Sequence, residues 1–212
     1  MKSLPLICIG GGGHCKSVIN VAEELGYSIM GVLDMPDKVG STILGYRVIG
    51  TDDDIESYAD RAQFIITVGH IKNPNIRLKI YDRLLKCNAH LATIVASTAK
   101  VSHFSEIGEG TVVLHNAVIN ADAKVGVNCI INTFSNIEHD AIVGDFCHIS
   151  TGTMVNGNCV IGERTFIGSG SVVSNGIEVP SDSVIGAASF MRKSYSVSGI
   201  YSGNPAILKI KL

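Results

Sequence analysis

Valine and isoleucine recur every six residues through the second half of this chain. Every sixth residue from Val95 to Ile185 is one of the two, with no exception over sixteen positions. A regularity of this length outranks local propensity when a fold is predicted. A six-residue period is typical of a β-helix built from short parallel strands, so the sequence predicts a solenoid.

A second register of small side chains accompanies the first. Four residues after each periodic position the side chain is small, and Ile177 is the one exception. We expect the large residues to fill the centre of a narrow coil and the small ones to let the chain turn a corner. Glycine directly follows the large residue at several turns, where a positive φ would favour it: Gly108, Gly126, Gly144, Gly162, Gly168 and Gly186.

The first ninety residues contain a different pattern, in which apolar runs typical of strands alternate with helical periodicity. Strands are predicted over residues 6–9, 29–33 and 64–68, and helices over residues 15–25 and 76–85. Alternating strands and helices predict a small parallel sheet. The expected fold is therefore a Rossmann-like α/β half-domain over residues 1–92, followed by a parallel β-helix with a C-terminal tail over residues 93–212.

A glycine run, residues 10–13, links the first predicted strand to the first predicted helix. Glycine allows backbone N–H groups to approach a phosphate, and the start of a helix favours anions. Asp34 follows the run after about 20 residues, a spacing that also occurs in the dinucleotide-binding motif. The region is, however, only about half as long as a full dinucleotide-binding domain. The pattern favours phosphate or nucleotide binding over NAD chemistry, and a tight turn that binds nothing is the alternative. His14, at the helix start, either faces a ligand or is a polar residue without a role.

Composition excludes several classes of partner. Hydrophobic residues make up 46% of the 212 residues and charged residues 17%, with a net charge of −2. This balance gives no electrostatic footprint for nucleic acid or an anionic membrane, and no apolar run approaches the roughly 20 residues that span a bilayer. The N-terminal stretch becomes glycine-rich too early for a signal peptide. We therefore expect a cytoplasmic protein.

Six cysteines raise the question of disulfides or a metal site. Cys129, Cys147 and Cys159 fall in the small-residue register, and the chain has no Cys-x-x-Cys pair. Isolated buried cysteine commonly behaves as a small hydrophobic residue. We expect structural roles for these cysteines and no metal.

One polar residue of the solenoid stands out by its type and its position. His139 precedes an acid, Asp140, and in coils of eighteen residues it would stack with His103, Ala121, Gly157 and Asn175. Adjacent coils lie about 4.8 Å apart, so the backbone of Gly157 is expected beside the imidazole. A general base next to an unshielded backbone donor is what acyl transfer requires.

Several short motifs together resemble one family. They are Gly-Gly-Gly-Gly-His-Cys-Lys-Ser at residues 10–17, Ile131-Asn132-Thr133, Ile137-Glu138-His139-Asp140, Cys147-His148-Ile149-Ser150 and Asn156-Gly157-Asn158. Over essentially its whole length, the chain resembles the sialic acid and bacillosamine acetyltransferases, which include the UDP-4-amino-sugar N-acetyltransferases. The resemblance implies a left-handed β-helix and a homotrimer with active sites between neighbouring β-helices. It also implies that acetyl-CoA lies along that groove as the co-substrate.

The same resemblance implies roles for individual residues. His139 would be the general base, and Asp140 would raise its basicity. Asn132 would help to position the acceptor, and the Gly157 amide would meet the thioester oxygen. The residues implied along the CoA groove are His148, Ser169 and Ala187. Those implied at the sugar nucleotide are Gly12, Gly13, His14, Asp34 and Gly69.

Two positions depart from the family pattern. Asp140 stands where the N-acetyltransferases carry a longer glutamate, which leaves open whether its carboxylate reaches the imidazole. Met35 stands where a second acid is expected after Asp34, which weakens the match at the nucleotide contact.

The expected function is transfer of an acetyl group from acetyl-CoA to the amino group of a nucleotide-linked amino-deoxy sugar, in bacterial surface glycan biosynthesis. O-acetylation of a sialic-acid-type sugar is one alternative, and a non-catalytic trimeric scaffold that binds a sugar nucleotide is another. A zinc enzyme that resembles γ-class carbonic anhydrase would need three histidines at a zinc ion. The His-x-x-x-x-His spacing of that class is absent, because His139 and His148 are nine residues apart.

Overall fold

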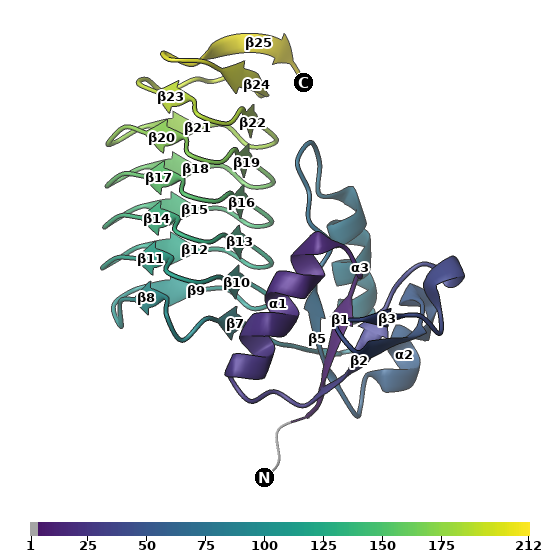
Figure 1. The fold of residues 1–212 in the computed structure, drawn as a ribbon. Coiled ribbons are helices and arrows are strands. Elements are labelled where there is room, and N and C mark those ends of the chain that lie inside the picture. The colour runs from purple at the N-terminus through teal and green to yellow at the C-terminus, as the bar shows by residue number, and fades with distance from the viewer. Residues whose placement is uncertain (1–3) are drawn as a thin grey trace. The chain divides into compact units, whose positions relative to one another are not determined.

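The computed structural model describes residues 4–212, so the first three residues of the N-terminal stretch considered above lie outside the described residues. The chain divides into two compact units, each described here by itself (Figure 1). One comprises the chain up to Gly69 together with Asn75–Ser97, and the other comprises His70–Pro74 and Thr98–Leu212. The boundary expected between residues 92 and 93 remains a prediction.

The first unit is an α/β sheet with the strand order β3-β4-β2-β1-β5-β6. Its strands are parallel except for β3, which pairs with β4 in the antiparallel sense at one edge. The elements are β1 (Leu6–Ile9), α1 (Gly13–Glu24), β2 (Ile29–Leu33), η1 (Pro36–Lys38), β3 (Thr42–Ile43), β4 (Tyr46–Gly50), η2 (Asp52–Asp54), α2 (Ile55–Tyr58), β5 (Gln63–Ile66), α3 (Asn75–Lys86), β6 (His90–Leu91) and β7 (Ile94–Val95).

The aliphatic residues of the central strands form the core of this unit. Ile9, Leu33 and Ile66 are buried and pack with Ile80 and Leu84 of α3. Because β1, β2 and β4 are parallel, the polar loops that follow them meet at one edge of the sheet. The predicted α/β half-domain is thus confirmed, whereas the β3–β4 hairpin and the short helices η1, η2 and α2 were not predicted.

The second unit confirms the predicted parallel β-helix (Figure 1). Each strand residue pairs with the residue eighteen positions later, as in Ile119, Ile137, Val155 and Val173, so one coil takes eighteen residues. One sheet contains β10 (Val112–Val113), β13 (Ile130–Ile131), β16 (His148–Ile149), β19 (Phe166–Ile167), β22 (Val184–Ile185) and the hairpin of β24 (Gly199–Ser202) and β25 (Ile207–Lys211).

Two further sheets complete the coils of the β-helix. The second contains β8 (Lys100–Val101), β11 (Val118–Ile119), β14 (Asn136–Ile137), β17 (Met154–Val155), β20 (Val172–Val173) and β23 (Phe190–Met191). The third contains β9 (Glu106–Ile107), β12 (Lys124–Val125), β15 (Ile142–Val143), β18 (Val160–Ile161) and β21 (Glu178–Val179).

Both sequence registers point into the β-helix. The large residues from Val113 to Ile185 are buried, and so are the small residues from Ala117 onward. Several small residues also act as hydrogen-bond donors to a carbonyl fifteen residues later: Cys129 Sγ bonds Gly144 O at 3.1 Å and Cys147 Sγ bonds Gly162 O at 3.1 Å. Burial raises the pKa of the Cys147 thiol, which therefore keeps its proton for this bond. None of the six cysteines, all of which lie within the described residues, is in a disulfide bond.

The glycines after the large residues correct one prediction. None of the six adopts a positive φ; they are needed because the next coil comes too close for a side chain. A Cβ on Gly144, for example, would lie 2.6 Å from the backbone nitrogen of Glu163. Positive φ occurs instead three residues after each large residue, from Gly110 to Ala188, at a position where residues as different as Phe134 and Arg164 also stand.

Candidate active site and nucleotide cavity

The turn after β14 holds the predicted base and its acidic partner. His139 Nδ1 lies 2.7 Å from Asp140 Oδ2, so the shorter acid does reach the imidazole. A carboxylate only accepts hydrogen bonds, so Nδ1 carries the hydrogen and the lone pair is on Nε2. Asp140 has φ of 60°, in the left-handed region that aspartate tolerates better than most residues. The hydrogen bond that His139 donates to the Asp140 carboxylate raises the pKa of His139.

The next coil brings Gly157 against the imidazole. A Cβ at Gly157 would lie 2.8 Å from His139 Nε2 and 2.7 Å from Cε1, so only glycine leaves the ring in this position. The flanking N–H groups are used by the coil, because Asn156 donates to Val173 O and Asn158 to His139 O. In the described part of the chain no such bond involves the Gly157 N–H. This donor is available beside the base.

Glu138, which the sequence analysis did not select, is held by two amides next to His139. Asn120 Nδ2 and Asn136 Nδ2 each donate to its carboxylate at 2.9 Å. The hydrogen bond from Asn136 is the main cause that lowers the pKa of Glu138, so a second negative charge stands beside the His139–Asp140 pair. A sequence signal existed, since Asn120 and Asn136 flank Glu138 at spacings of eighteen and two residues.

Asn132 and His148 form a separate hydrogen-bonded pair on the sheet of β13 and β16. His148 Nδ1 donates to the carbonyl of His70 at 2.9 Å, which leaves Nε2 to accept from Asn132 Nδ2 at 3.3 Å. Asn132 Oδ1 in turn accepts from the Thr133 N–H at 2.8 Å. The structure thus places Asn132 with His148 and not with His139, which follows a different sheet.

Ser169 and Ala187 lie on neighbouring coils and are both exposed. Ser169 Oγ is 2.8 Å from Ser150 Oγ. Gly168 allows the coil of Ala187 to come close, since a Cβ there would lie 2.5 Å from the Ala187 nitrogen. These two residues belong to the turns that follow β19 and β22, on the same side of the β-helix as Asn132 and His148.

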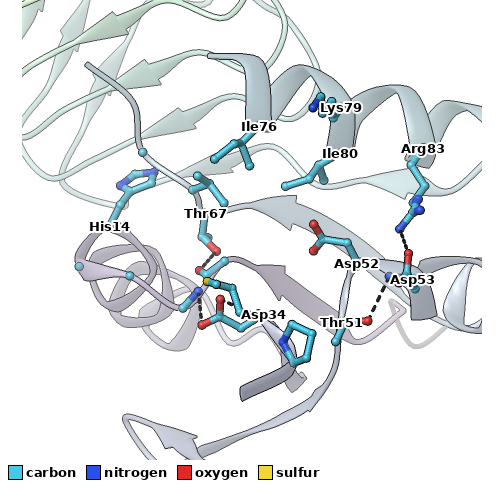
Figure 2. Close-up of a pocket in the computed structure, with 18 residues that line it drawn as sticks. His14, Asp34, Thr51, Asp52, Asp53, Thr67, Ile76, Lys79, Ile80 and Arg83 are labelled. Carbon is cyan, nitrogen blue, oxygen red and sulfur yellow. Dashed lines mark hydrogen bonds and ion pairs between the residues drawn. The ribbon is translucent and has the colours of Figure 1, made fainter. Parts of the chain in front are cut away.

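The first unit contains a cavity of about 830 Å³ at the carboxyl ends of its parallel strands (Figure 2). All five residues expected at a sugar nucleotide line it: Gly12, Gly13, His14, Asp34 and Gly69. The lining residues that were not predicted are Pro36, Thr51, Asp52, Asp53, Thr67, Val68, Ile76, Lys79, Ile80 and Arg83. The turn with Asp52 and Asp53 follows β4, a strand that the sequence analysis missed.

The glycine run shapes the cavity in two ways. Gly10 has φ of 99° and Gly11 packs so closely that a Cβ would lie 2.5 Å from Asp34 Oδ2. Gly12 and Gly13, by contrast, have open space where a Cβ would be, so they leave room in the cavity at the start of α1. No side chain caps this helix start. Its free N–H groups suit an anion such as a phosphate.

Asp34 ties the glycine run to the end of β2. Its Oδ2 accepts from the Gly11 N–H at 3.2 Å and its Oδ1 from the Met35 N–H at 2.8 Å. Met35, which stands where a second acid was expected, is 64% exposed and also lines the cavity. The acid therefore lies beside the glycine run, in the arrangement of sites where an acid contacts a ribose.

Within residues 4–212, no group of three or more His, Cys, Asp and Glu side chains is arranged to hold a metal ion. None of the helices in this range has both the length and the apolar character needed to cross a bilayer.

Comparison with family models finds two matches along the chain. The PglD N-terminal domain matches residues 5–84, and the bacterial transferase hexapeptide, with six repeats, matches residues 140–175. The chain is also 34% identical over 111 residues to an uncharacterised protein of Acanthamoeba polyphaga mimivirus. That stretch is 52% of this chain, which spans only about a fifth, 21%, of the curated relative.

Solved structures match the chain over nearly its whole length. A histidine-to-asparagine variant of perosamine N-acetyltransferase from Caulobacter crescentus, in complex with CoA and GDP-perosamine, is 28% identical with a TM-score of 0.91. The match covers 98% of this chain and 99% of that one. The acetyltransferase domain of PglB from Neisseria gonorrhoeae, in complex with acetyl coenzyme A, is 29% identical with a TM-score of 0.90, covering 98% and 100%.

Proposed function

This chain belongs to the left-handed β-helix acetyltransferases with hexapeptide repeats, and we propose that it acetylates the amino group of a nucleotide-linked amino-deoxy sugar with acetyl-CoA. The observation that carries the proposal is the His139–Asp140 pair with Nε2 against the Gly157 backbone. The N-acetyltransferases named above bind CoA or a nucleotide-linked amino sugar, which supports both substrates.

The chemistry is direct transfer between the two substrates. The neutral amine of the sugar attacks the thioester carbonyl of acetyl-CoA while His139 Nε2 accepts the amine proton. The Gly157 N–H donates to the oxyanion of the tetrahedral intermediate, which collapses with loss of the CoA thiolate. A positioned base typically contributes about 10²- to 10⁴-fold, and loss of an oxyanion donor costs about 10²- to 10³-fold.

The remaining predicted residues are assigned under the same proposal. The cavity formed by Gly12, Gly13, His14, Asp34 and Gly69 would hold the nucleotide end of the acceptor. Asn132, His148, Ser169 and Ala187 would line the groove for acetyl-CoA between the β-helices of a homotrimer. Asn132 acts here as a positioning residue, because its amide holds His148 Nε2. The reaction is assigned to the cytoplasm, where acetyl-CoA is available.

Purified protein tests the proposal when it is incubated with acetyl-CoA and a panel of UDP-, dTDP- and GDP-linked amino sugars and free sialic acids, with thiol release as the readout. We expect turnover with a nucleotide-linked amino sugar and N-acetylated product by mass spectrometry. Turnover only with sialic acids would favour O-acetylation. Binding of a sugar nucleotide with no binding of acetyl-CoA would favour the scaffold.

His139→Ala is the decisive variant. We expect it to keep its fold and its affinity for CoA and to lose about 10²- to 10⁴-fold in kcat. Since the His139 side chain is exposed, its removal leaves no cavity in the core. Turnover close to that of the unaltered protein would contradict the assignment of His139 as the base.

A further inference from the structure

The acidic turn after β4 contains one carboxylate that the fold does not use. In the run of three consecutive aspartates, Asp54 Oδ2 accepts from the Thr51 N–H at 2.7 Å and Asp53 Oδ1 pairs with Arg83 at 2.7 Å. Within residues 4–212, the carboxylate of Asp52 has no hydrogen-bond or ion-pair partner, although its backbone carbonyl accepts from the Ile55 N–H. Its carboxylate is nevertheless directed into the cavity (Figure 2).

Local hydrogen bonds and close packing hold the backbone of the turn that carries Asp52. Thr51 and Asp54 form a capping box at the start of η2. Gly50 permits this fold, because a Cβ there would lie 2.5 Å from Asp54 Oδ2. Partial burial raises the pKa of Asp52, and the attraction of Arg83, which is paired with Asp53, offsets the lost solvation only in part. A ligand that donates hydrogen bonds would supply a partner for this carboxylate.

The sheet topology places Asp52 where a nucleobase would lie. β1, β2 and β4 are adjacent and parallel, and their carboxyl ends lead to the glycine run, to Asp34 and to the Asp52 turn in that order. Neighbouring strands are about 4.8 Å apart. A nucleotide with its phosphates at the glycine run and its ribose at Asp34 therefore extends its base toward Asp52.

Apolar side chains at this end of the cavity suit a flat ring. Met35 and Ile76 line the cavity and are 64% and 60% exposed, so they offer accessible apolar surface to a ligand. Pro36 and the buried Ile80 also line the cavity. Apolar surfaces accept any base, so the base must be selected by polar groups, and among these the Asp52 carboxylate is an acceptor that no donor among the described residues engages.

We propose that the cavity selects a guanine nucleotide, with the N1–H and the exocyclic N2–H of guanine donating to the two carboxylate oxygens of Asp52. A carboxylate is an acceptor-only group with two oxygens. Guanine presents two adjacent donors on one edge. Uracil and thymine present a single N–H between two carbonyl oxygens, which a carboxylate repels, and adenine presents its amino group beside an acceptor nitrogen. The inference rests on the proposed function, because it takes the cavity as the nucleotide site.

Titration calorimetry with nucleoside diphosphates alone tests the inference without acetyl-CoA or sugar. We expect GDP to bind at least about 10-fold more tightly than UDP or ADP. Inosine diphosphate lacks the exocyclic amine of guanine and should also bind about 10-fold more weakly than GDP, because one charge-assisted hydrogen bond is lost. This comparison needs no variant. Binding of UDP as tight as that of GDP would overturn the guanine assignment and leave the proposed function intact.

A pair of charge-matched variants isolates the side chain. Asp52→Asn should lower the binding affinity for GDP about 10- to 100-fold and change the affinity for UDP by less than about 3-fold. It should also remove the preference for GDP over inosine diphosphate. Asp37→Asn removes the same charge from an exposed residue outside the cavity and should keep that preference. An unchanged GDP preference in Asp52→Asn would refute the inference. If no nucleotide binds to the unaltered protein, both the inference and the nucleotide-linked acceptor fail.

Discussion

At the residue scale, the Asp140 carboxylate determines the pH range in which His139 can act as a base. The hydrogen bond raises the pKa of His139 above its ordinary value, so the imidazole is protonated and inactive up to a higher pH than a free histidine. We expect kcat/KM to fall as the pH drops through this raised pKa and to level off above it. A profile that is flat between pH 6 and 9 would contradict a histidine base.

The variant Asp140→Asn should show how the Asp140 carboxylate affects the basicity of the His139 imidazole. Loss of the carboxylate lowers the pKa of His139, so the acid limb of the profile moves to lower pH while the plateau rate falls. Asp122→Asn is a matched control, because Asp122 occupies the same left-handed turn position, with φ of 59°, and follows Ala121 instead of a histidine. We expect its pH profile to be unchanged. An equal shift in both variants would mean that the pH at which kcat/KM falls depends on general surface charge and not on the His139–Asp140 pair.

The ionised Asp52 carboxylate should lower the free energy of unfolding of the first unit at neutral pH. Its pKa is raised in the folded chain, so the folded state binds the proton more tightly than the unfolded state, and stability falls as the pH rises through that pKa. Asp52→Asn removes this penalty at neutral pH and should raise Tm by about 1–3 °C. Thermal unfolding by circular dichroism at pH 7.5 and at pH 4 measures the effect, which should shrink at the lower pH. A drop in Tm at pH 7.5 would show that Asp52 stabilises the fold.

At the scale of the element, the periodic strands of the β-helix depend on one large residue each. Ile149 of β16 is fully buried, and Ile149→Ala should cost about 2–5 kcal/mol in the free energy of unfolding. Ile142 of β15 is the matched control, because its side chain points out of the coil and is 44% exposed, so Ile142→Ala should cost less than about 1 kcal/mol. Denaturant titration compares the two. Equal costs would show that the outer face of β15 is as closely packed as the interior.

The β-helix could be predicted from the sequence because its packing repeats from coil to coil. Each coil imposes the same packing demand, so Val155 or Ile161 is identified by its neighbours six residues away. Most residues at the left-handed turn position are Gly, Asn or Asp, although Phe134, Arg164 and Ala188 also occupy it. The position was misassigned because glycine also recurs directly after the large residues, where close packing of the coils requires it. In the first unit nothing repeats, and β4 carries a mixed sequence, Tyr46–Gly50, of which only Val48 and Gly50 are buried. The Asp52 turn that follows β4 was therefore missed.

The candidate site shows the same limit. The column of eighteen residues sufficed to place Gly157 beside His139, because stacking in a β-helix is fixed by register. The same register of eighteen residues stacks Asn120 with Glu138, so that contact could also have been predicted. The contact between Asn132 and His148 could not, because it depends on side-chain rotamers and on a segment far away in sequence, whose His70 carbonyl orients His148.

At the scale of the whole molecule, the proposed active site would combine residues of more than one chain. His139 follows β14, whereas His148 belongs to β16 on a different sheet, so one β-helix presents the proposed base and the proposed CoA-side residue on separate faces. Cyclic assembly solves this, because in a ring the same two faces of neighbouring subunits meet at every interface. We therefore expect a homotrimer whose sites each combine His139 of one subunit with His148 of the next.

Mixed trimers test this arrangement. His139→Ala and His148→Ala should each be nearly inactive alone, since every site lacks one of its two residues. When the two variants are co-expressed in equal amounts and assemble at random, roughly a quarter of the interfaces pair an intact His139 with an intact His148. About that fraction of the activity should return, while trimers are verified by sedimentation. As a control, co-expression of His139→Ala with Asp140→Asn should restore far less, because both changes affect the same side of each interface. No recovery in the first mixture would mean that the two histidines act from the same chain.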